Sequence, residues 1–424
     1  MRDYGLDLTG CISLQYIPNT IGKMKCLKQL HLTRCRDVEI LPEELGSLEC
    51  LEVLCLHGCE SLRDIPNSIC NMKCLTRLTI SYCTEVKKLP EELGCIECLE
   101  ELSLTGCTSL RDIPNSICKL KRLKRLDLSY CNRVNKLPEE LGCLECLEEL
   151  ELKKCKSLQD IPNSICKMTR LKRLALPRCH QVQRLPEEFG CLECLEELDL
   201  TGYKSLQDIP NSIGKMKSLK RLYLSNCHQV RKLPEELGCL QCLEELDLRG
   251  CRSLLDIPNS IGKMKSLKRL YLSNCHQVRK LPEELGCLQC LEVLDLRGCR
   301  SLLDIPNSIC KIKCLQNLDL SGCIRVGKLP EELGCLECLK VLDLRECASL
   351  QDIPSSISKM KSLRGLYLCH CIRVEKLPDE LGSLECLTLS IDGTATSCLP
   401  QSIYQMKGLN LEWSDECFFP DGFF

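Results

Sequence analysis

Pairs of cysteines separated by two residues are the first feature of this sequence whose type and spacing could do chemistry. Each pair stands in a near-copy of "LGCLECLEEL", the sequence of residues 141–150. Two converging pairs of this kind bind zinc, and a single pair can act as a redox centre. The six pairs are Cys95/Cys98, Cys143/Cys146, Cys191/Cys194, Cys239/Cys242, Cys287/Cys290 and Cys335/Cys338.

Other residues with chemical potential are copies of one another. The segment "IGKM" at 213–216 superficially resembles a phosphate loop, but no glycine stands five residues before Gly214 and methionine follows the lysine. The six histidines and the carboxylates form no unique constellation, because every candidate recurs in neighbouring segments. Catalysis needs one unique site. The sequence therefore predicts a protein that is not an enzyme and that uses no cofactor and no metal.

Composition narrows the class of protein further. The 424 residues are 44% hydrophobic and 27% charged, with a net charge of −2, which is typical of a soluble chain that forms a core. The absence of excess positive charge argues against nucleic acid as a partner, and no apolar run is long enough for a membrane span. Forty cysteines without a secretory signal or an Asn-x-Ser/Thr acceptor indicate free thiols in a reducing compartment. We therefore expect a cytoplasmic protein.

A repeat of 24 residues runs through the chain and accounts for most of these features. Leu-x-Leu pairs recur from residues 6/8 to residues 366/368, with Ile80 as the one substitution. A cysteine follows each pair three residues later, except where Tyr203 replaces it, and a proline keeps the same step. Units in strict phase leave no space for separate globular domains, so the sequence predicts one solenoid.

Each unit reads L-x-x-L-x-L-x-x-C-x-x-L-x-x-[LI]-P-x-x-[LIF], the pattern of a leucine-rich repeat. The Leu-x-Leu core is a short strand with both leucines facing the core, the cysteine fills a buried turn, and the proline opens a helical turn. The predicted fold class is α/β, a leucine-rich-repeat solenoid shaped as a curved horseshoe, with a parallel concave sheet and short helical turns on the convex side. We assign 1–386 to 24-residue units, 387–411 to an irregular last repeat and 412–424 to an aromatic C-terminal cap or tail.

This repeat decides how the cysteine pairs are interpreted. Consecutive pairs are 48 residues apart, which places them two strands and about 10 Å from each other. Zinc–sulfur bonds of about 2.3 Å cannot span that distance. We therefore interpret the pairs as structural packing on the convex side, and we expect neither a metal site nor functional disulfides.

The outward residues of the concave strands are the candidates for binding a partner. The position before the first leucine alternates between arginine and glutamate from Arg77 to Arg269, which predicts ion pairs between neighbouring strands. The positions between and after the leucines carry aspartate, tyrosine and arginine, and tyrosine and arginine are enriched among binding hot spots. The predicted partner-binding residues are Asp199, Tyr223, Asp247, Arg249, Tyr271, Asp295, Arg297, Asp319, Asp343, Arg345 and Tyr367.

Residues 109–155, "SLRDIPNSICKLKRLKRLDLSYCNRVNKLPEELGCLECLEELELKKC", closely resemble the repeats of plant intracellular nucleotide-binding leucine-rich-repeat disease resistance proteins. The terminal "LNLEWSDECFFPDGFF" is similar to an aromatic tail that follows the repeats in some helper-class members. In that family the repeats sense a partner and hold a neighbouring nucleotide-binding domain inactive. The resemblance implies a non-enzymatic recognition or regulatory repeat domain in plant defence. Its partner would be a pathogen effector, a guarded host protein or a receptor domain.

Two other functions fit the same repeats. An intracellular signalling scaffold would use them without attached domains, as do the "LPxxL"-type proteins that bridge small GTPases and phosphatases. The substrate-recognition part of a ubiquitin ligase also places cysteine at the turn, although no adaptor-binding helical motif is visible before the repeats. The first repeat begins in mid-strand at Leu6, which leads us to expect further sequence upstream.

Overall fold

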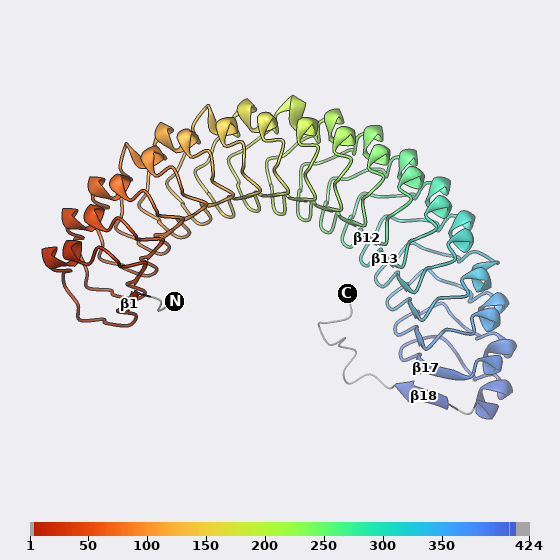
Figure 1. Ribbon diagram of the computed structural model, residues 1–424. Helices are drawn as coiled ribbons and strands as arrows, with labels where there is room; N and C mark the ends of the chain where they lie inside the picture. Colours follow the sequence, from red (N-terminus) through yellow and green to blue (C-terminus); the bar gives the residue numbers. More distant parts are fainter. Residues whose placement is uncertain (1–3, 407, 413–424) are drawn as a thin grey trace. The chain divides into compact units, whose positions relative to one another are not determined.

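The computed structural model describes residues 4–406 and 408–412, and it contains two compact units, Met1–Leu219 and Lys220–Phe424. Both units repeat the same elements: a short strand, a tight turn, an extended segment and a 3-10 turn of three or five residues. In each unit the strands follow one side, the strand side, and the 3-10 turns follow the other, the turn side (Figure 1). The predicted strands and helical turns are confirmed, with 3-10 geometry for the turns.

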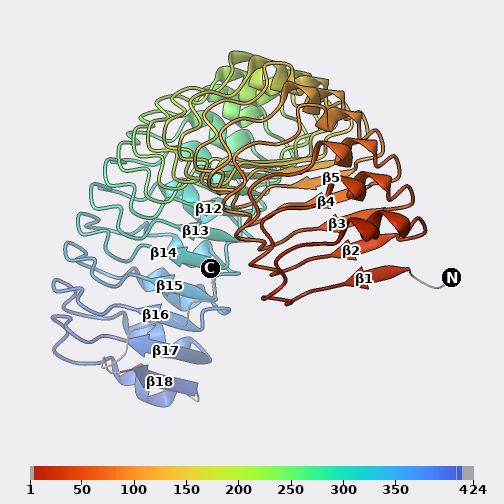
Figure 2. The same ribbon diagram turned by 90° about the vertical axis from the view of Figure 1, so that its left-hand side faces the viewer.

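The strands of the first unit form a parallel sheet in chain order, and each residue pairs with the residue 24 positions later (Figure 2). These strands are β1 (Gly5–Asp7), β2 (Gln29–His31), β3 (Val53–Cys55), β4 (Arg77–Thr79), β5 (Glu101–Ser103), β6 (Arg125–Asp127), β7 (Glu149–Glu151), β8 (Arg173–Ala175) and β9 (Glu197–Asp199). The 3-10 turns are η1 (Asn19–Lys23), η2 (Glu43–Ser47), η3 (Asn67–Asn71), η4 (Leu93–Cys95), η5 (Asn115–Lys119), η6 (Leu141–Cys143), η7 (Asn163–Lys167), η8 (Glu187–Cys191) and η9 (Asn211–Lys215).

The strands of the second unit continue the same pattern and are paired in parallel, in chain order from β10 to β18. Its strands are β10 (Arg221–Tyr223), β11 (Glu245–Asp247), β12 (Arg269–Tyr271), β13 (Val293–Asp295), β14 (Asn317–Asp319), β15 (Val341–Asp343), β16 (Gly365–Tyr367), β17 (Cys386–Ser390) and β18 (Gly408–Glu412). Its 3-10 turns are η10 (Glu235–Cys239), η11 (Asn259–Lys263), η12 (Glu283–Cys287), η13 (Asn307–Lys311), η14 (Leu333–Cys335), η15 (Ser355–Lys359), η16 (Asp379–Ser383) and η17 (Gln401–Gln405).

The repeat shortens at the end of the second unit. Leu366 pairs with Leu389 and Leu387 pairs with Leu409, so the step between partners falls below 24 residues. This change lies in the segment assigned to an irregular last repeat. Most of the aromatic tail assigned to 412–424 lies outside the described residues.

The core of each unit is a stack of leucines contributed by successive repeats. The two core leucines of a repeat, such as Leu270 and Leu272, are fully buried, and so is Cys275. We call the cysteine at this position, three residues after the second leucine, the ring cysteine of its repeat. Because each leucine pairs in register with the leucine of the next strand, the side chains stack in continuous rows. One repeat alone could not cover these side chains, so folding depends on contact between neighbouring repeats.

The turn after each strand explains why cysteine recurs there. The chain reverses through a residue with positive φ, such as Asn274 at 60° or Gly298 at 67°, a conformation favoured by glycine and asparagine. The ring cysteine that follows donates its S–H to a backbone carbonyl of the preceding repeat, for example from Cys299 Sγ to the Leu272 oxygen at 3.2 Å. The thiol thus satisfies a buried acceptor without introducing a charge.

Most 3-10 turns begin directly after a proline in an extended conformation, whereas η4, η6 and η14 begin two residues later, after a glutamate. Pro258 has φ −65° and ψ 145°, and its carbonyl accepts the N–H of Ile261 at 3.0 Å. Ile261 is buried against the leucine stack. Among the described residues no helix is long and apolar enough to cross a membrane.

Candidate interaction surface

One residue stands between the two core leucines of every strand, and we call these residues the central row. Strand alternation turns its side chains to the face opposite the leucine stack. In the second unit the row is in register from strand to strand, as with Asp295, Asp319 and Asp343. Its members on β10 to β16 are Tyr223, Asp247, Tyr271, Asp295, Asp319, Asp343 and Tyr367.

The aspartates of the central row end their strands by accepting a local hydrogen bond. In each case one carboxylate oxygen accepts the backbone N–H two residues later, with the Asp295 bond from Arg297 at 3.0 Å and the Asp319 bond from Ser321 at 2.8 Å. Asp199 makes the same bond with Thr201 at 2.9 Å in the first unit. Such side-chain-to-backbone bonds favour a turn over continued strand. The aspartates therefore help to fix where each strand stops.

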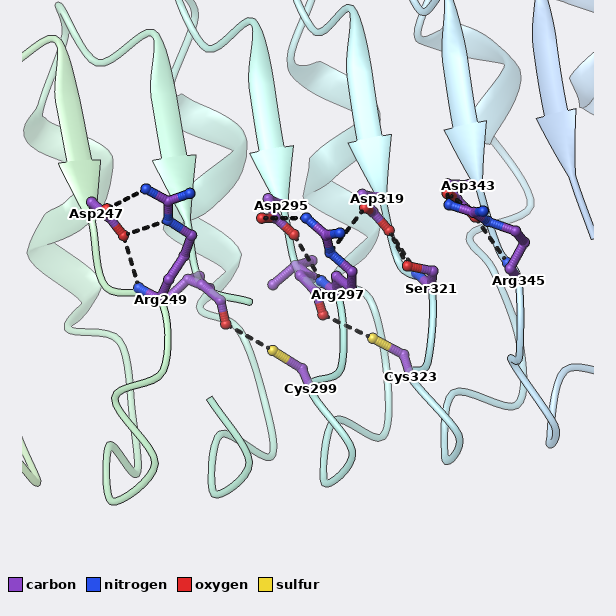
Figure 3. A network of polar contacts seen from close by, with 12 residues as sticks. Asp247, Arg249, Asp295, Arg297, Cys299, Asp319, Ser321, Cys323, Asp343 and Arg345 are labelled. Atoms are coloured by element: carbon purple, nitrogen blue, oxygen red, sulfur yellow. Dashed lines mark hydrogen bonds and ion pairs between the residues drawn. The ribbon is translucent and has the colours of Figure 1, made fainter. Parts of the chain in front are cut away.

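Three arginines that follow the row lie beside its carboxylates (Figure 3). Arg249 donates from Nε and Nη2 to the two oxygens of Asp247 at 3.0 and 2.6 Å. Arg345 donates from Nε and Nη2 to Asp343 at 3.0 and 2.6 Å. This two-point geometry is the strong form of an arginine–carboxylate pair. Both carboxylates are buried, with side-chain exposures of 3% and 0%.

Arg297 is held more loosely than the other two arginines. Its Nη2 lies 3.9 Å from Asp295 Oδ2, and its Nε lies 3.7 Å from Asp319 Oδ2. The guanidinium therefore stands between the carboxylates of two strands (Figure 3). Its side chain is 51% exposed, compared with 47% for Arg249 and 17% for Arg345. Of these three arginines, Arg249 and Arg297 are thus the two that a partner reaches most easily.

Asp319 differs from the other row aspartates of the second unit because no arginine stands two residues after it. Ser321 takes that position and donates its hydroxyl to Asp319 Oδ1 at 2.6 Å. Asp319 also stands in register between Asp295 and Asp343. Burial and the neighbouring charge of Asp343 raise the pKa of Asp319 to about 7. Burial raises the pKa of Asp295 as well. Asp319 is therefore a buried carboxyl group that titrates near neutral pH.

Tyrosines of the central row contact the same arginines. The Arg249 guanidinium lies 5.0 Å from the ring centre of Tyr271, and that of Arg345 lies 5.8 Å from Tyr367. Both distances are within the range of a cation–π contact. Tyr271 is buried, and this burial raises the pKa of its hydroxyl. Tyr223 and Tyr367 are half-buried.

The position before the first leucine forms a second row beside the central one, which we call the flanking row. The ion pairs expected between neighbouring strands are present, with Arg77 and Glu101 at 2.6 Å and Arg269 and Glu245 at 3.0 Å. From β13 to β16 the flanking row carries no charged side chain. The flanking row then consists of Val293, Asn317, Val341 and Gly365. The central row of the second unit thus borders a stretch without charge.

The structure places the predicted partner-binding residues in both units. Asp199 belongs to the first unit, and the others belong to the second. The sequence predicted that the aspartates are outward contact groups, whereas the structure buries the four of the second unit beside arginines, down to 0% exposure for Asp343, and leaves Asp199 half-buried. Partner binding by these residues stays a prediction. Sequence reasoning missed Ser321 and the uncharged flank, although alignment of the repeats shows both, since serine replaces arginine at 321 and valine replaces glutamate at 293.

The six Cys-x-x-Cys pairs do not converge on one another. Across the described residues, no three His, Cys, Asp or Glu side chains gather as a metal site. Within one pair the thiols face different neighbours, because Cys95 Sγ lies 3.5 Å from Glu92 Oε2 and Cys98 Sγ lies 3.7 Å from Arg122 Nη1. All the thiols of the six pairs are exposed or half-buried. This exposure differs from the packing role that the sequence led us to expect.

Comparison with protein-family models identifies the repeats. The model described as a leucine-rich repeat region matches residues 5–133 and 114–226, and the leucine rich repeat model matches residues 218–240, 242–264, 266–288, 290–312 and 314–336. The chain therefore belongs to the leucine-rich repeat family. Repeats of this family form extended binding surfaces for other proteins, so the chain is a protein-interaction module.

Solved structures show the same fold. A leucine-rich repeat protein of Leptospira interrogans is 27% identical, with a TM-score of 0.70 over 97% of this chain and 96% of that chain. The crystal structure of a TDR receptor is 21% identical, with a TM-score of 0.50 over 97% of this chain and 88% of that one, a likeness that concerns the fold alone. A search of curated proteins found no match.

Proposed function

We propose that this chain is the recognition domain of a plant defence protein that acts in the cytoplasm. Its partner, a pathogen effector or a guarded host protein, binds the central row of the second unit. The close resemblance of residues 109–155 to the repeats of plant disease resistance proteins supports the defence role. Membership of the leucine-rich repeat family supports protein binding as the activity.

The pre-organised Arg249, which lies beside the central row, carries this proposal. Arg249 is fixed by two hydrogen bonds to a buried carboxylate and lies over the Tyr271 ring, yet 47% of its side chain is exposed. A side chain that is already ordered loses little conformational entropy when a partner binds. Two bonds to Asp247 use two of the five guanidinium donors, which leaves donors for a carboxylate of the partner.

The uncharged flank adds a second element of recognition. Val293 and Val341 are half-buried beside the central row, and Asn317 lies between them in register. Hydrophobic contact next to a fixed cation is the arrangement of a binding hot spot. We therefore expect the partner to present an acidic side chain toward Arg249 or Arg297 and apolar side chains toward the two valines.

Testing this proposal requires a variant that removes the cation without uncovering its buried partner. The double replacement Asp247→Asn and Arg249→Gln does so, because asparagine can still accept the backbone N–H of residue 249. The matched control is Arg252→Ala with Arg300→Ala, which removes two exposed arginines from repeats of the same unit but outside the row.

The partner is first isolated from extracts of infected plant tissue on the immobilised chain, then purified, and its affinity for each variant is measured by calorimetry. We expect the row variant to bind at least about tenfold more weakly and the control to bind as the wild type does. Equal binding by the row variant would remove the central row as the interface. A partner that is neither pathogen-derived nor part of host defence would refute the defence role, whatever the interface.

A further inference from the structure

Exposed cysteines recur at one position in four successive repeats of the first unit. Each stands directly before the core leucine that leads into a strand, from β2 to β5. Three of the four are exposed and the last is half-buried. We call these residues, Cys26, Cys50, Cys74 and Cys98, the thiol ladder.

The register of the strands fixes the spacing of the ladder. Gln29 pairs with Val53 and Val53 pairs with Arg77, three residues after the respective cysteines, and the same register continues into β5. One residue nearer to the cysteines along the chain, the N–H of Glu52 donates to the Lys28 carbonyl at 2.8 Å. Neighbouring parallel strands lie about 4.8 Å apart. A disulfide joins Cα atoms about 4.4–6.8 Å apart. Neighbouring ladder cysteines therefore fall within bonding range, and cysteines two repeats apart, at about 10 Å, do not.

Side chains at this position reach their neighbours along the ladder. In the next repeats arginine and cysteine alternate at this position, and Arg122 Nη1 lies 3.7 Å from Cys98 Sγ. The same contact recurs between Arg170 Nη1 and Cys146 Sγ at 3.8 Å. These two contacts show that side chains of successive repeats point along a common surface, as a cross-link between them requires.

The ladder differs in accessibility from the ring cysteines of the same repeats. Cys59, Cys83 and Cys107 are buried and donate to backbone carbonyls. Burial also raises the pKa of Cys107 to about 12, which removes its reactive thiolate. An oxidant in solution therefore reacts with the ladder cysteines and not with the buried ring cysteines of the same repeats.

We propose that the thiol ladder is a modification site at which glutathione disulfide cross-links neighbouring repeats. The thiolate of one ladder cysteine attacks glutathione disulfide, forms a mixed disulfide and releases one glutathione thiolate. The neighbouring ladder thiolate attacks the protein sulfur of that mixed disulfide, which forms the inter-repeat disulfide and releases the second glutathione. Two protein thiols are oxidised, one glutathione disulfide is reduced, and the two protons lost by the protein pass to the two glutathione thiolates.

The cross-link would fasten successive repeats of the first unit to each other. Each disulfide closes a loop of one repeat and restricts the unfolded chain, so it raises the temperature at which these repeats separate. This inference concerns the first unit alone and does not depend on the proposed function of the second.

The test treats the purified full chain with glutathione disulfide at pH 8, quenches with acid and maps the peptides by mass spectrometry without reduction. We expect disulfides between adjacent ladder positions, such as Cys26 with Cys50 or Cys74 with Cys98, in a chain that remains monomeric on a non-reducing gel. Ladder cysteines that accumulate as stable mixed disulfides, or that link one chain to another, would overturn the proposal.

The matched variant Cys50→Ser with Cys98→Ser leaves two ladder thiols two repeats apart. Both replaced side chains are exposed or half-buried, and circular dichroism checks that the fold is kept. We expect Cys26 and Cys74 of this variant to retain glutathione at least about tenfold more than in the wild type, because no neighbouring thiol is in reach. A disulfide between Cys26 and Cys74, or between Cys74 and Cys70, would contradict the geometry on which the proposal stands.

Discussion

Replacing Asp319 with asparagine should stabilise the second unit at neutral and alkaline pH and have little effect in acid. The carboxyl group of Asp319 is 2% exposed and stands between two other row aspartates, Asp295 and Asp343. Its pKa is raised from 3.8 to about 7, chiefly by burial and then by the charge of Asp343. An asparagine keeps an oxygen for the Ser321 hydrogen bonds and removes the buried charge.

The sign and size of the effect follow from proton linkage. Because the folded pKa of Asp319 lies above its unfolded value, its contribution to stability is full below about pH 4 and is lost as the pH rises through about 7. A difference of about three pKa units, at about 1.36 kcal/mol each, gives roughly 4 kcal/mol at pH 8. Asp319→Asn should therefore gain up to about 4 kcal/mol over the wild type at pH 8 and almost nothing at pH 4.

The assay is urea unfolding of both proteins between pH 4 and pH 9, followed by circular dichroism. Repeat proteins can unfold in steps, so the transition of the second unit is compared between variants rather than fitted as one event. The reasoning fails if the variant is less stable than the wild type at pH 8. It also fails if the difference between the two proteins does not change between pH 4 and pH 8.

Three further expectations follow from particular contacts. Arg345→Ala should destabilise the second unit by about 3–5 kcal/mol, because it leaves the fully buried carboxylate of Asp343 without its cation. Its control, Arg300→Ala at the exposed surface, should change the free energy of unfolding in urea by less than about 0.5 kcal/mol. Equal effects of the two substitutions would contradict this expectation. Gly238→Ala should cost about 1–3 kcal/mol in the same assay, since its Cβ would lie 2.3 Å from a backbone oxygen of the next turn. Gly327→Ala, where the nearest atom lies at 3.8 Å, is its control. Iodoacetamide at pH 7.5 should modify the exposed thiols of the folded protein and spare Cys107, because burial raises the pKa of this thiol to about 12. Early labelling of Cys107 in peptide maps would count against its burial.

Much of the fold could be predicted from the spacing of a few residue types. The 24-residue step of the leucines predicts one strand per repeat, and the structure places strands such as Arg269–Tyr271 at that step. The register needs no further information, because a one-residue slip would turn the leucines away from the core. The proline step likewise locates each 3-10 turn, as with Pro258 before Asn259–Lys263.

The environment of the central row could not be predicted in the same way. Alternation correctly turns Asp295 and Asp343 away from the leucine stack, but it says nothing about what covers them. Their burial depends on side chains from neighbouring strands and on arginines that fold back two residues later, as Arg345 does onto Asp343. Such contacts depend on side-chain conformations that a sequence pattern does not specify.

Local variation in the 3-10 turns was also hidden from the sequence. A Cβ at Gly262 would lie 2.4 Å from a backbone oxygen of the following turn, and that turn, η12, spans five residues. Where Cys310 occupies the equivalent position, the following turn shrinks to Leu333–Cys335, and Glu332 before it has ψ 19°. After Cys166, at the same position, the next turn keeps five residues but contains Glu188 with the same ψ of 19°. This variation becomes visible only when the backbone conformation is known.

The most direct test of partner binding by the central row is site-specific photo-cross-linking in infected plant tissue. A benzophenone amino acid replaces Val293, half-buried beside the row, or Lys311, exposed on a 3-10 turn of the same unit. We expect one pathogen-derived or host defence protein to cross-link from position 293 and not from position 311. Cross-linking of that protein from position 311 alone would place the interface on the turn side and contradict the central claim.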